Sequence, residues 1–377
     1  MKIVILNDTA GDEARVSATP ETVKGYIGAG HSVAVVKNAG AKADFPDAAY
    51  KAAGASIATT NAAGVKTADF VMSVTGGTAK LVAGLKKGAG ITGVLSPTDN
   101  PKYVKACAKA GVTAFSLDYI PRISRAQAMD VLSSQSNLAG YRAVVEAGSI
   151  YGRAFPMMMT AAGTIAPAKT FIMGVGVAGL QAIATARRLG AVTTATDVRP
   201  ATKEQVASLG AKFIAVENEE FKAAETAGGY AKQMSAEYQA LQAELMAKHI
   251  AKQDIVITTA LIPGRAAPVL VTKAMLDTMK PGSVLVDLAV ERGGNVEGAK
   301  PGAIVTTKNG VHIVGHLNWP SRMAADSSNM FARNLKNFLP LVTAEDGGYA
   351  PDWDDEIIQG CALTRGGDIV HERLKRG

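Results

Sequence analysis

One glycine-rich segment, GVGVAG at residues 174–179, constrains the fold of this chain more than any other feature. An apolar run at 170–173 precedes it, a helical pattern follows it, and Asp197 ends the next apolar run, 23 residues after Gly174. Gly-x-Gly-x-x-Gly alone is a weak signal. Strand, loop, helix and second strand within about thirty residues, however, predict a dinucleotide-binding βαβ unit.

Each position of this motif has a physical role. Gly174 permits the tight turn, Gly176 lets a pyrophosphate approach the backbone, and Gly179 lets helix and strand pack closely. The helix N-terminus supplies free N–H donors for phosphates. Asp197 would accept hydrogen bonds from the adenosine ribose and repel a 2′-phosphate, which favours NAD, whereas Arg199 could grip that phosphate. A βα turn without any ligand is the alternative.

Apolar runs divide the chain into two series of predicted strands with helical patterns between them. The first series is 2–6, 31–36, 69–74, 90–95 and 112–117, and the second is 170–173, 192–197, 211–216, 254–260, 283–289 and 311–315. Such alternation predicts parallel α/β layers, the second a six-stranded doubly wound sheet.

The expected fold class is therefore α/β, with two Rossmann-like domains, each a mostly parallel sheet flanked by helices, joined by long connector helices. A length of 377 residues also favours two domains. We expect residues 1–125 to form the N-terminal domain with 321–377 folding back onto it, and 126–320 to hold a connector helix and the nucleotide-binding domain. The connector is a helical run from Arg122 to Tyr151, and 363–370 predicts a hairpin.

Composition excludes several classes of protein. The longest weakly polar stretch, 154–168, is too short for a membrane span and contains two prolines. Cys107 and Cys361 form no CxxC pair, which disfavours disulfides and zinc and fits a reducing compartment. The net charge of +7 comes from scattered Lys and Arg without interleaved aromatics, which favours a basic surface for anionic ligands or an acidic partner over nucleic acid.

A second candidate feature is a polar stripe in 121–141. If this segment is helical, one face carries Gln127, Asp130, Ser133 or Ser134, Asn137 and Tyr141. No charged residue occurs from 131 to 141, whereas solvated faces normally carry Lys and Glu. The stripe therefore indicates a buried or ligand-facing hydrogen-bond network, with a solvated face as the alternative.

Three further segments lie at predicted strand ends or in long connections. Residues 258–264 and 287–295 follow strands at the carboxyl edge where cofactors bind in doubly wound folds, although ordinary turns are equally consistent. Residues 225–232 combine paired glycines with Tyr230, as a mobile lid or a plain surface loop would.

Together these segments resemble a known family. The stretches PRISRAQAMDVLSSQSNLAGYRAV, FPMMMTAAGT, GVGVAGLQAIATARRLGA, TDVRPATKEQV, ETAGGYAK, TTALIPG and DLAVERGGN resemble the NAD(H)-binding component, domain I, of proton-translocating nicotinamide nucleotide transhydrogenase. The resemblance covers almost the whole chain and is densest from Pro121 to Asn295. Alanine dehydrogenase is the sister family with the same two-domain plan.

The resemblance implies a Si-side transhydrogenase component that passes hydride from NADH to NADP⁺ on a partner domain. It also implies a homodimer, a separate transmembrane domain that translocates protons, and a cytoplasmic or mitochondrial-matrix location peripheral to an energy-transducing membrane. The implied catalytic loop residues are Arg122, Gln127, Asp130 and Ser133. The implied NAD(H)-binding residues are Tyr141, Gly174, Gly176, Val177, Ala178, Gly179, Asp197, Val198, Arg199, Gly229, Tyr230, Ala260 and Leu261. No metal is expected.

Departures from the family pattern bear on the reaction. Asn7-Asp8 stands where Lys-Glu is usual, Ser73 replaces a lysine that alanine dehydrogenases use on substrate, and 93–100 lacks their catalytic histidine. Leu317 stands where threonine is common.

Oxidising an amino or hydroxy acid requires a proton donor or acceptor, whereas hydride exchange between two nicotinamides requires only positioning, for example by Gln127 and Asp130. We therefore favour a hydride-transfer half-site. An alanine-dehydrogenase-like oxidoreductase and an NAD-sensing module without turnover are the alternatives.

Overall fold

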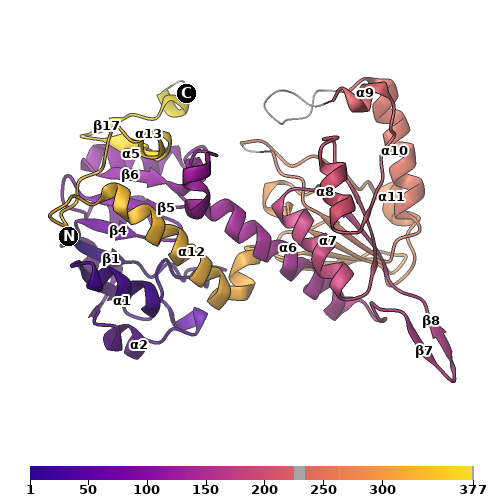
Figure 1. Cartoon of the computed structure of the whole chain (residues 1–377), viewed down its shortest axis with the longest axis horizontal. Coiled ribbons are helices and arrows are strands. Elements are labelled where there is room, and N and C mark those ends of the chain that lie inside the picture. Colours follow the sequence, from indigo (N-terminus) through magenta and orange to yellow (C-terminus); the bar gives the residue numbers. More distant parts are fainter. Residues whose placement is uncertain (225–233, 263, 376–377) are drawn as a thin grey trace. The chain divides into compact units, whose positions relative to one another are not determined.

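The computed structural model describes residues 1–224, 234–262 and 264–375 (Figure 1). The chain forms two compact units. Unit 1 comprises Met1–Gln135 and Pro320–Gly377, and unit 2 comprises Ser136–Trp319. Unit 2 is thus an insertion between the two chain segments that build unit 1.

The sheet of unit 1 has six parallel strands in the order β3-β2-β1-β4-β5-β6. They are β1 (Lys2–Ile5), β2 (Ser32–Val36), β3 (Ser56–Ala58), β4 (Phe70–Met72), β5 (Gly90–Gly93) and β6 (Thr113–Ser116). Five of the six lie within predicted apolar runs. The sequence prediction missed β3 because this edge strand has three residues, none of them buried.

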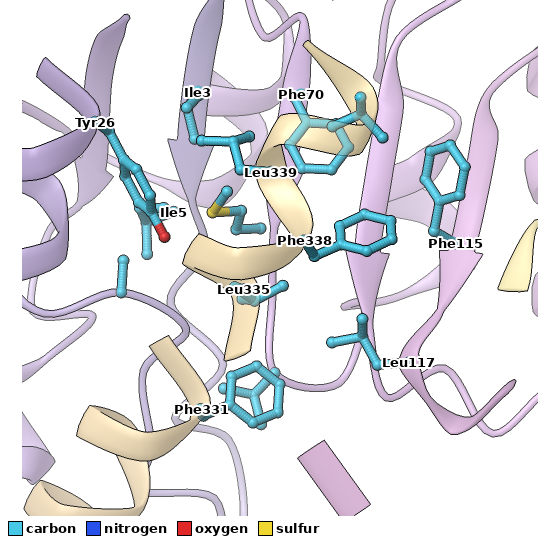
Figure 2. Packing of buried hydrophobic residues seen from close by; sticks show 14 of the residues in the cluster. Ile3, Ile5, Tyr26, Phe70, Phe115, Leu117, Phe331, Leu335, Phe338 and Leu339 are labelled. Atoms are coloured by element: carbon cyan, nitrogen blue, oxygen red, sulfur yellow. The ribbon is translucent and has the colours of Figure 1, made fainter. Parts of the chain in front are cut away.

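Alternating side chains of this sheet face two helical layers. Ile3 and Ile5 belong to one buried cluster with Phe331 and Phe338 of α12 (Ala324–Phe338), and Figure 2 shows these residues. Val4, in contrast, packs in a second cluster with helices on the opposite face. The first layer contains α1 (Pro20–Gly28), α2 (Asp47–Ala52) and α12; the second contains α3 (Asn61–Val65), α4 (Ala79–Val82) and α5 (Pro101–Ala110).

The C-terminal segment completes unit 1. Besides α12 it supplies α13 (Glu356–Cys361), whose Ile357 and Ile358 are fully buried in the first cluster. The predicted hairpin is present as β16 (Thr364–Arg365) and β17 (Asp368–Ile369), and α14 (Glu372–Lys375) follows it. Unit 1 therefore depends on residues from both ends of the chain.

Unit 2 contains a seven-stranded sheet in the order β11-β10-β9-β12-β13-β15-β14. The strands are β9 (Lys169–Met173), β10 (Val192–Thr196), β11 (Lys212–Phe213), β12 (Ile255–Thr258), β13 (Val284–Asp287), β14 (Ala303–Thr306) and β15 (His312–Gly315). All pairs are parallel except that of β14, an edge strand missed by the sequence prediction because none of its residues is buried. The strand order reverses between β9 and β12, which is where doubly wound sheets bind ligands.

Helices cover this second sheet, so both units have the predicted α/β class. They are α7 (Val177–Arg188), α8 (Thr202–Ser208), α9 (Glu219–Lys222), α10 (Ala236–Ile250) and α11 (Lys273–Asp277). Outside the sheet, β7 (Met158–Thr160) and β8 (Gly163–Ile165) form a hairpin that extends away from the body of unit 2 (Figure 1). Among the described residues, no helix is both long and apolar enough to span a bilayer.

The connector helix differs from its prediction. Residues Ser124–Met129 form a short 3₁₀ helix, η3, and only Val131–Ile150 forms the α-helix, α6. Asp130 separates them with an extended ψ of 91°. Its carboxylate accepts the backbone N–H of Ser133 at 2.9 Å and the Ser133 hydroxyl at 2.6 Å. The interpretation of 121–141 as one helix was therefore wrong before Val131, because Asp130 caps a new helix.

Candidate functional site

The glycine loop of unit 2 is shaped by steric limits at two glycines and by open space at the third. Gly174 has a φ of +101°, and a Cβ there would lie 2.6 Å from the Thr259 hydroxyl. A Cβ at Gly179 would collide with the carbonyl oxygen of Gly174, whereas one at Gly176 would meet nothing within 4 Å. The first-turn N–H groups of α7 follow directly, so an anion can approach the backbone at Gly176.

An ion pair lies beside this loop, at the end of β10. Arg199 Nε is 2.9 Å from Asp197 Oδ1 and Nη2 is 3.0 Å from Oδ2. Asp197 also accepts the N–H of Val175 at 2.7 Å, and Arg199 donates to the Val175 carbonyl at 3.2 Å. Asp197 is therefore anchored to the loop. Its negative charge is balanced by Arg199, the residue that the sequence analysis considered as a possible ligand of a 2′-phosphate. Val198, between them, is exposed.

The strand end across the reversal point is tied to the same loop. Thr259, which follows β12, donates its hydroxyl to the Gly174 carbonyl at 2.9 Å. Ala260 donates its N–H to Asn295 Oδ1 at 3.0 Å, and Asn295 Nδ2 returns a bond to the Ala260 carbonyl at 2.9 Å. Leu261 is exposed beyond this pair. Asn295 thus holds the predicted backbone strip at Ala260–Leu261.

Sequence reasoning missed the role of Asn295 in holding this strip. Asn295 is fully buried in a loop held by Asp287, which accepts N–H groups of Ala289, Asn295 and Val296. Burial raises the pKa of Asp287 above its usual value, although these N–H bonds lower it. The sequence feature that could have indicated this role is the run DLAVERGGN, in which Asn295 follows two glycines after the end of a predicted strand.

Helix α6 approaches the glycine loop closely at one glycine. A Cβ at Gly140 would collide with the carbonyl of Ala178 in the first turn of α7. Asn137, one turn earlier, donates to Gln181 Oε1 at 3.3 Å. Tyr141 follows and is 40% exposed. The later half of the polar stripe therefore lies along α7 in unit 2.

The earlier half of the stripe belongs to unit 1, where α12 holds it. Asn334 donates to the carbonyl of Ala128 in η3 at 2.8 Å and accepts the Ser134 hydroxyl at 2.8 Å. Asn337 donates to the same Ala128 carbonyl at 3.1 Å. These two amides fix the backbone between Gln127 and Asp130. Both were missed by sequence reasoning, because they lie more than 200 residues further along the chain.

The predicted catalytic residues vary in exposure. Arg122 and Gln127 are exposed, while Asp130 and Ser133 are partly buried and bond to each other.

A buried ion pair supports the start of α6 from the other side. Arg15 donates to both carboxylate oxygens of Glu13, at 2.9 and 2.8 Å, and to Gln135 Oε1 at 2.8 Å. Burial alone would raise the pKa of Glu13, but hydrogen bonds from Arg15 and Ser321 outweigh it and hold the pKa at about 2. Gln135 in turn donates to the Ser327 carbonyl at 3.1 Å.

Ser73, which stands where alanine dehydrogenases have a lysine, hydrogen-bonds to Asp8. Its hydroxyl donates to Asp8 at 2.8 Å, and Asp8 also accepts the N–H of Val74 at 2.8 Å and the Thr75 hydroxyl at 3.2 Å. Burial raises the pKa of Asp8 despite these bonds. Asp8 and Ser73 therefore satisfy each other at the ends of β1 and β4.

Two predicted residues, Gly229 and Tyr230, lie outside the described residues. Within the described ranges, no cluster of three His, Cys, Asp or Glu side chains could hold a metal ion.

The sequence matches two family models, the alanine dehydrogenase/PNT C-terminal domain at residues 143–372 and the N-terminal domain at 4–139. It is 54% identical to the first part of NAD(P) transhydrogenase subunit alpha from Rhodospirillum rubrum, with 99% of each chain covered, and 48% identical to that from Rickettsia prowazekii, with 98% and 96% covered. A transhydrogenase structure from Sinorhizobium meliloti aligns with a TM-score of 0.85 at 50% identity, covering 99% and 100%. An L-alanine dehydrogenase structure shares the fold, with a TM-score of 0.81 at 21% identity, covering 100% and 98%.

Proposed function

Since this chain belongs to the alanine dehydrogenase/PNT family, we propose that it is the NAD(H)-binding component of a Si-side, proton-translocating NAD(P) transhydrogenase. The observation that carries the proposal is the open glycine loop at Gly176 beside Asp197, in a chain similar over its full length to subunits named transhydrogenase alpha. In this proposal the chain supplies one nucleotide half-site, and NADP(H) binds on a partner domain.

The donor set of unit 2 fits NAD(H). The backbone at Gly176, Val177 and Ala178 offers N–H groups to a pyrophosphate, and the Cβ-free space at Gly176 gives it room. Each carboxylate oxygen of Asp197 already accepts two N–H bonds, so Asp197 would accept from the adenosine ribose with an oxygen that the Arg199 guanidinium releases. The strip at Ala260–Leu261 would lie beside the second ribose. Tyr141, Val198 and Arg199, with Gly229 and Tyr230, complete the proposed binding set.

The residues proposed to act at the nicotinamide are Arg122, Gln127, Asp130 and Ser133. The bound nicotinamide would supply the hydride, which passes with its electron pair from NADH to NADP⁺ and leaves NAD⁺ and NADPH. No proton is exchanged at the reacting carbons, so the side chains need only hold the rings in place and exclude water. Exposed Gln127 and the fixed turn at Asp130 are suited to that task.

The proposed partners are an NADP(H)-binding domain and a transmembrane domain that translocates protons, with the chain peripheral to that membrane in the cytoplasm or the mitochondrial matrix. We also propose a homodimer. Met158 and Met159 of β7, and Met157 just before it, are exposed, and Leu189 is exposed elsewhere in unit 2. Exposed apolar surface of this kind is typical of a subunit interface.

The alternative alanine-dehydrogenase-like reaction is disfavoured by the contacts of Ser73. Its single proton is directed at Asp8, and its oxygen accepts the N–H of Gly76 at 2.7 Å. A satisfied neutral hydroxyl there cannot replace a lysine ammonium that binds or protonates a substrate.

Two assays separate these reactions. Purified chain mixed with a soluble NADP(H)-binding transhydrogenase component and NADH should reduce thio-NADP⁺, and each protein alone should not. The chain alone with pyruvate, ammonia and NADH should show no steady turnover. Turnover in the second assay would refute the proposal, whereas NADH binding without activity in either assay would favour a sensing module.

A further inference from the structure

Most of the net positive charge of this chain comes from one stretch. Residues 61–113 contain seven lysines and two aspartates, with no arginine or glutamate, so this stretch carries +5 of the net +7. All seven lysines, here called the lysine face, are exposed. They are Lys66, Lys80, Lys86, Lys87, Lys102, Lys105 and Lys109. Lys and Arg are spread along the whole chain, but in this stretch few acidic residues balance them.

The lysine face lies on one side of unit 1. Helices α3, α4 and α5 pack on the same face of the sheet through Val65, Val82 and Val104. Neighbouring helices in this layer contact each other, α3 with α4 and α4 with α5. Their outer surfaces therefore form one continuous layer, opposite the layer that contains α12.

Helix α5 shows the pattern most clearly. Lys102, Lys105 and Lys109 follow i, i+3 and i+7 spacing on its exposed side. Tyr103, Val104, Cys107 and Ala108 are buried on the other side. The three ammonium groups therefore point away from the core as a stripe.

The chemistry of the lysine face identifies its partner class. The structure describes every residue of 61–113 and exposes no large apolar side chain there. Protein interfaces are usually enriched in aromatic residues and arginine and depleted in lysine. Lysine ammonium groups without an apolar centre suit diffuse attraction to a dense layer of phosphate charges, as on an anionic bilayer.

We propose that the lysine face binds the surface of an anionic lipid bilayer without insertion. The attraction needs no pocket and no ordering of the lipids, because the field of the headgroups acts over a Debye length of about 10 Å at 0.1 M salt. This inference is independent of the transhydrogenase proposal, because vesicle binding is measured without any nucleotide or partner.

The test is co-sedimentation of the full chain with vesicles of equimolar phosphatidylglycerol and phosphatidylcholine, and with vesicles of phosphatidylcholine alone. We expect binding only to the anionic vesicles and its loss on raising NaCl from about 0.05 to 0.5 M, which shortens the Debye length severalfold. Equal binding to both vesicles, or no binding at low salt, would overturn the proposal.

The variant Lys102→Gln/Lys105→Gln/Lys109→Gln tests the location. Each lysine near an anionic leaflet raises partitioning about fivefold, so the triple variant should bind on the order of 100-fold more weakly. Its matched control is Lys248→Gln/Lys273→Gln/Lys308→Gln in unit 2, which removes three exposed lysines outside the lysine face and should bind nearly as well as the parent.

Circular dichroism and thermal unfolding should be unchanged in both variants, because all six side chains are exposed. If both variants bind anionic vesicles equally weakly, binding depends only on the net charge of the chain, and the proposal of a specific lysine face is refuted. Normal vesicle binding by the α5 variant, with lost activity toward the NADP(H)-binding component, would identify an acidic protein as the partner and also refute the lipid proposal.

Discussion

Arg199 spans both carboxylate oxygens of Asp197, at 2.9 and 3.0 Å, at the edge of the glycine loop. Its guanidinium therefore cancels the negative charge that would otherwise exclude a 2′-phosphate. We predict that Arg199→Met, which leaves Asp197 unbalanced, lowers NADPH affinity at least about tenfold more than NADH affinity. Isothermal titration of both nucleotides measures the ratio. Lys203→Met, which breaks an exposed ion pair with Glu217, is the control, and an unchanged ratio in Arg199→Met would contradict the prediction.

The two glycines Gly176 and Gly179 offer a matched pair of substitutions. Gly176→Ala places its methyl in open space and has an ordinary φ of −82°, so it should fold normally and lose NADH affinity on the order of tenfold. Gly179→Ala drives its methyl into the Gly174 carbonyl and should destabilise the chain by about 1–3 kcal/mol. Urea unfolding and NADH titration check both. A Gly176→Ala chain with unaltered NADH affinity would argue against phosphate binding at this loop.

The amide of Asn334 should influence turnover through η3. Asn334→Leu removes the bonds to Ala128 and Ser134 at a mostly buried position. The Ala128 carbonyl still accepts Asn337 and the Ser134 hydroxyl still donates to the Val131 carbonyl, so we expect a cost of only about 1 kcal/mol. We expect a lower kcat for thio-NADP⁺ reduction with an unchanged Kd for NADH. Asn337→Leu, at an exposed position, should lower kcat less. A parallel loss of NADH affinity in Asn334→Leu would indicate general unfolding rather than displacement of Gln127 and Asp130.

Acid should destabilise unit 1 through Glu13. Its folded pKa of about 2 lies below the usual 4.5, so its stabilising contribution is complete above about pH 5 and is lost as the pH falls toward 2. The shift corresponds to roughly 3 kcal/mol. Urea unfolding of the parent and of Glu13→Gln at pH 7 and pH 3 should show a smaller stability difference at the lower pH.

The pKa of Asp8 is shifted in the opposite direction to that of Glu13. Its pKa is raised, so its unfavourable burial as an anion grows as the pH rises through the folded pKa. Asp8→Asn should therefore not reproduce the acid dependence of Glu13→Gln, and an identical pH profile for the two variants would contradict this assignment.

The β7–β8 hairpin should carry the proposed dimer contact. Met159 is 75% exposed, so Met159→Asp should leave the monomer fold intact and shift the chain from dimer to monomer in sedimentation equilibrium. Lys308→Asp, at an exposed site elsewhere in unit 2, is the control. A monomeric parent chain at micromolar concentration would refute the homodimer.

The sequence predicted the buried parallel strands well, because apolar runs such as 2–6 and 254–260 leave few alternatives once glycines and helical patterns separate them. Gly174 and Gly179 also take up the tight turn and close packing expected of them, while their nucleotide-binding roles stay predictions. The edge strands β3 and β14 were missed because exposed positions carry a weak periodic signal.

Contacts between residues far apart in the sequence could not be predicted either. Asp130 looked like one more polar residue of a helical face, and its capping geometry became visible only with the backbone. Asn295 and Asn334 bond to residues 35 and 206 positions away, so no local window could pair them.

The insertion of unit 2 into unit 1 imposes an order on synthesis. By the time Trp319 leaves the ribosome, every residue of unit 2 is available to fold. At that moment the core of unit 1 still lacks Phe331, Phe338 and Ile357. The N-terminal strands, which emerge first, therefore keep one apolar face uncovered until these residues are synthesised. The segment synthesised first therefore keeps its apolar surface exposed for longest, and truncation before α12 would leave that surface uncovered.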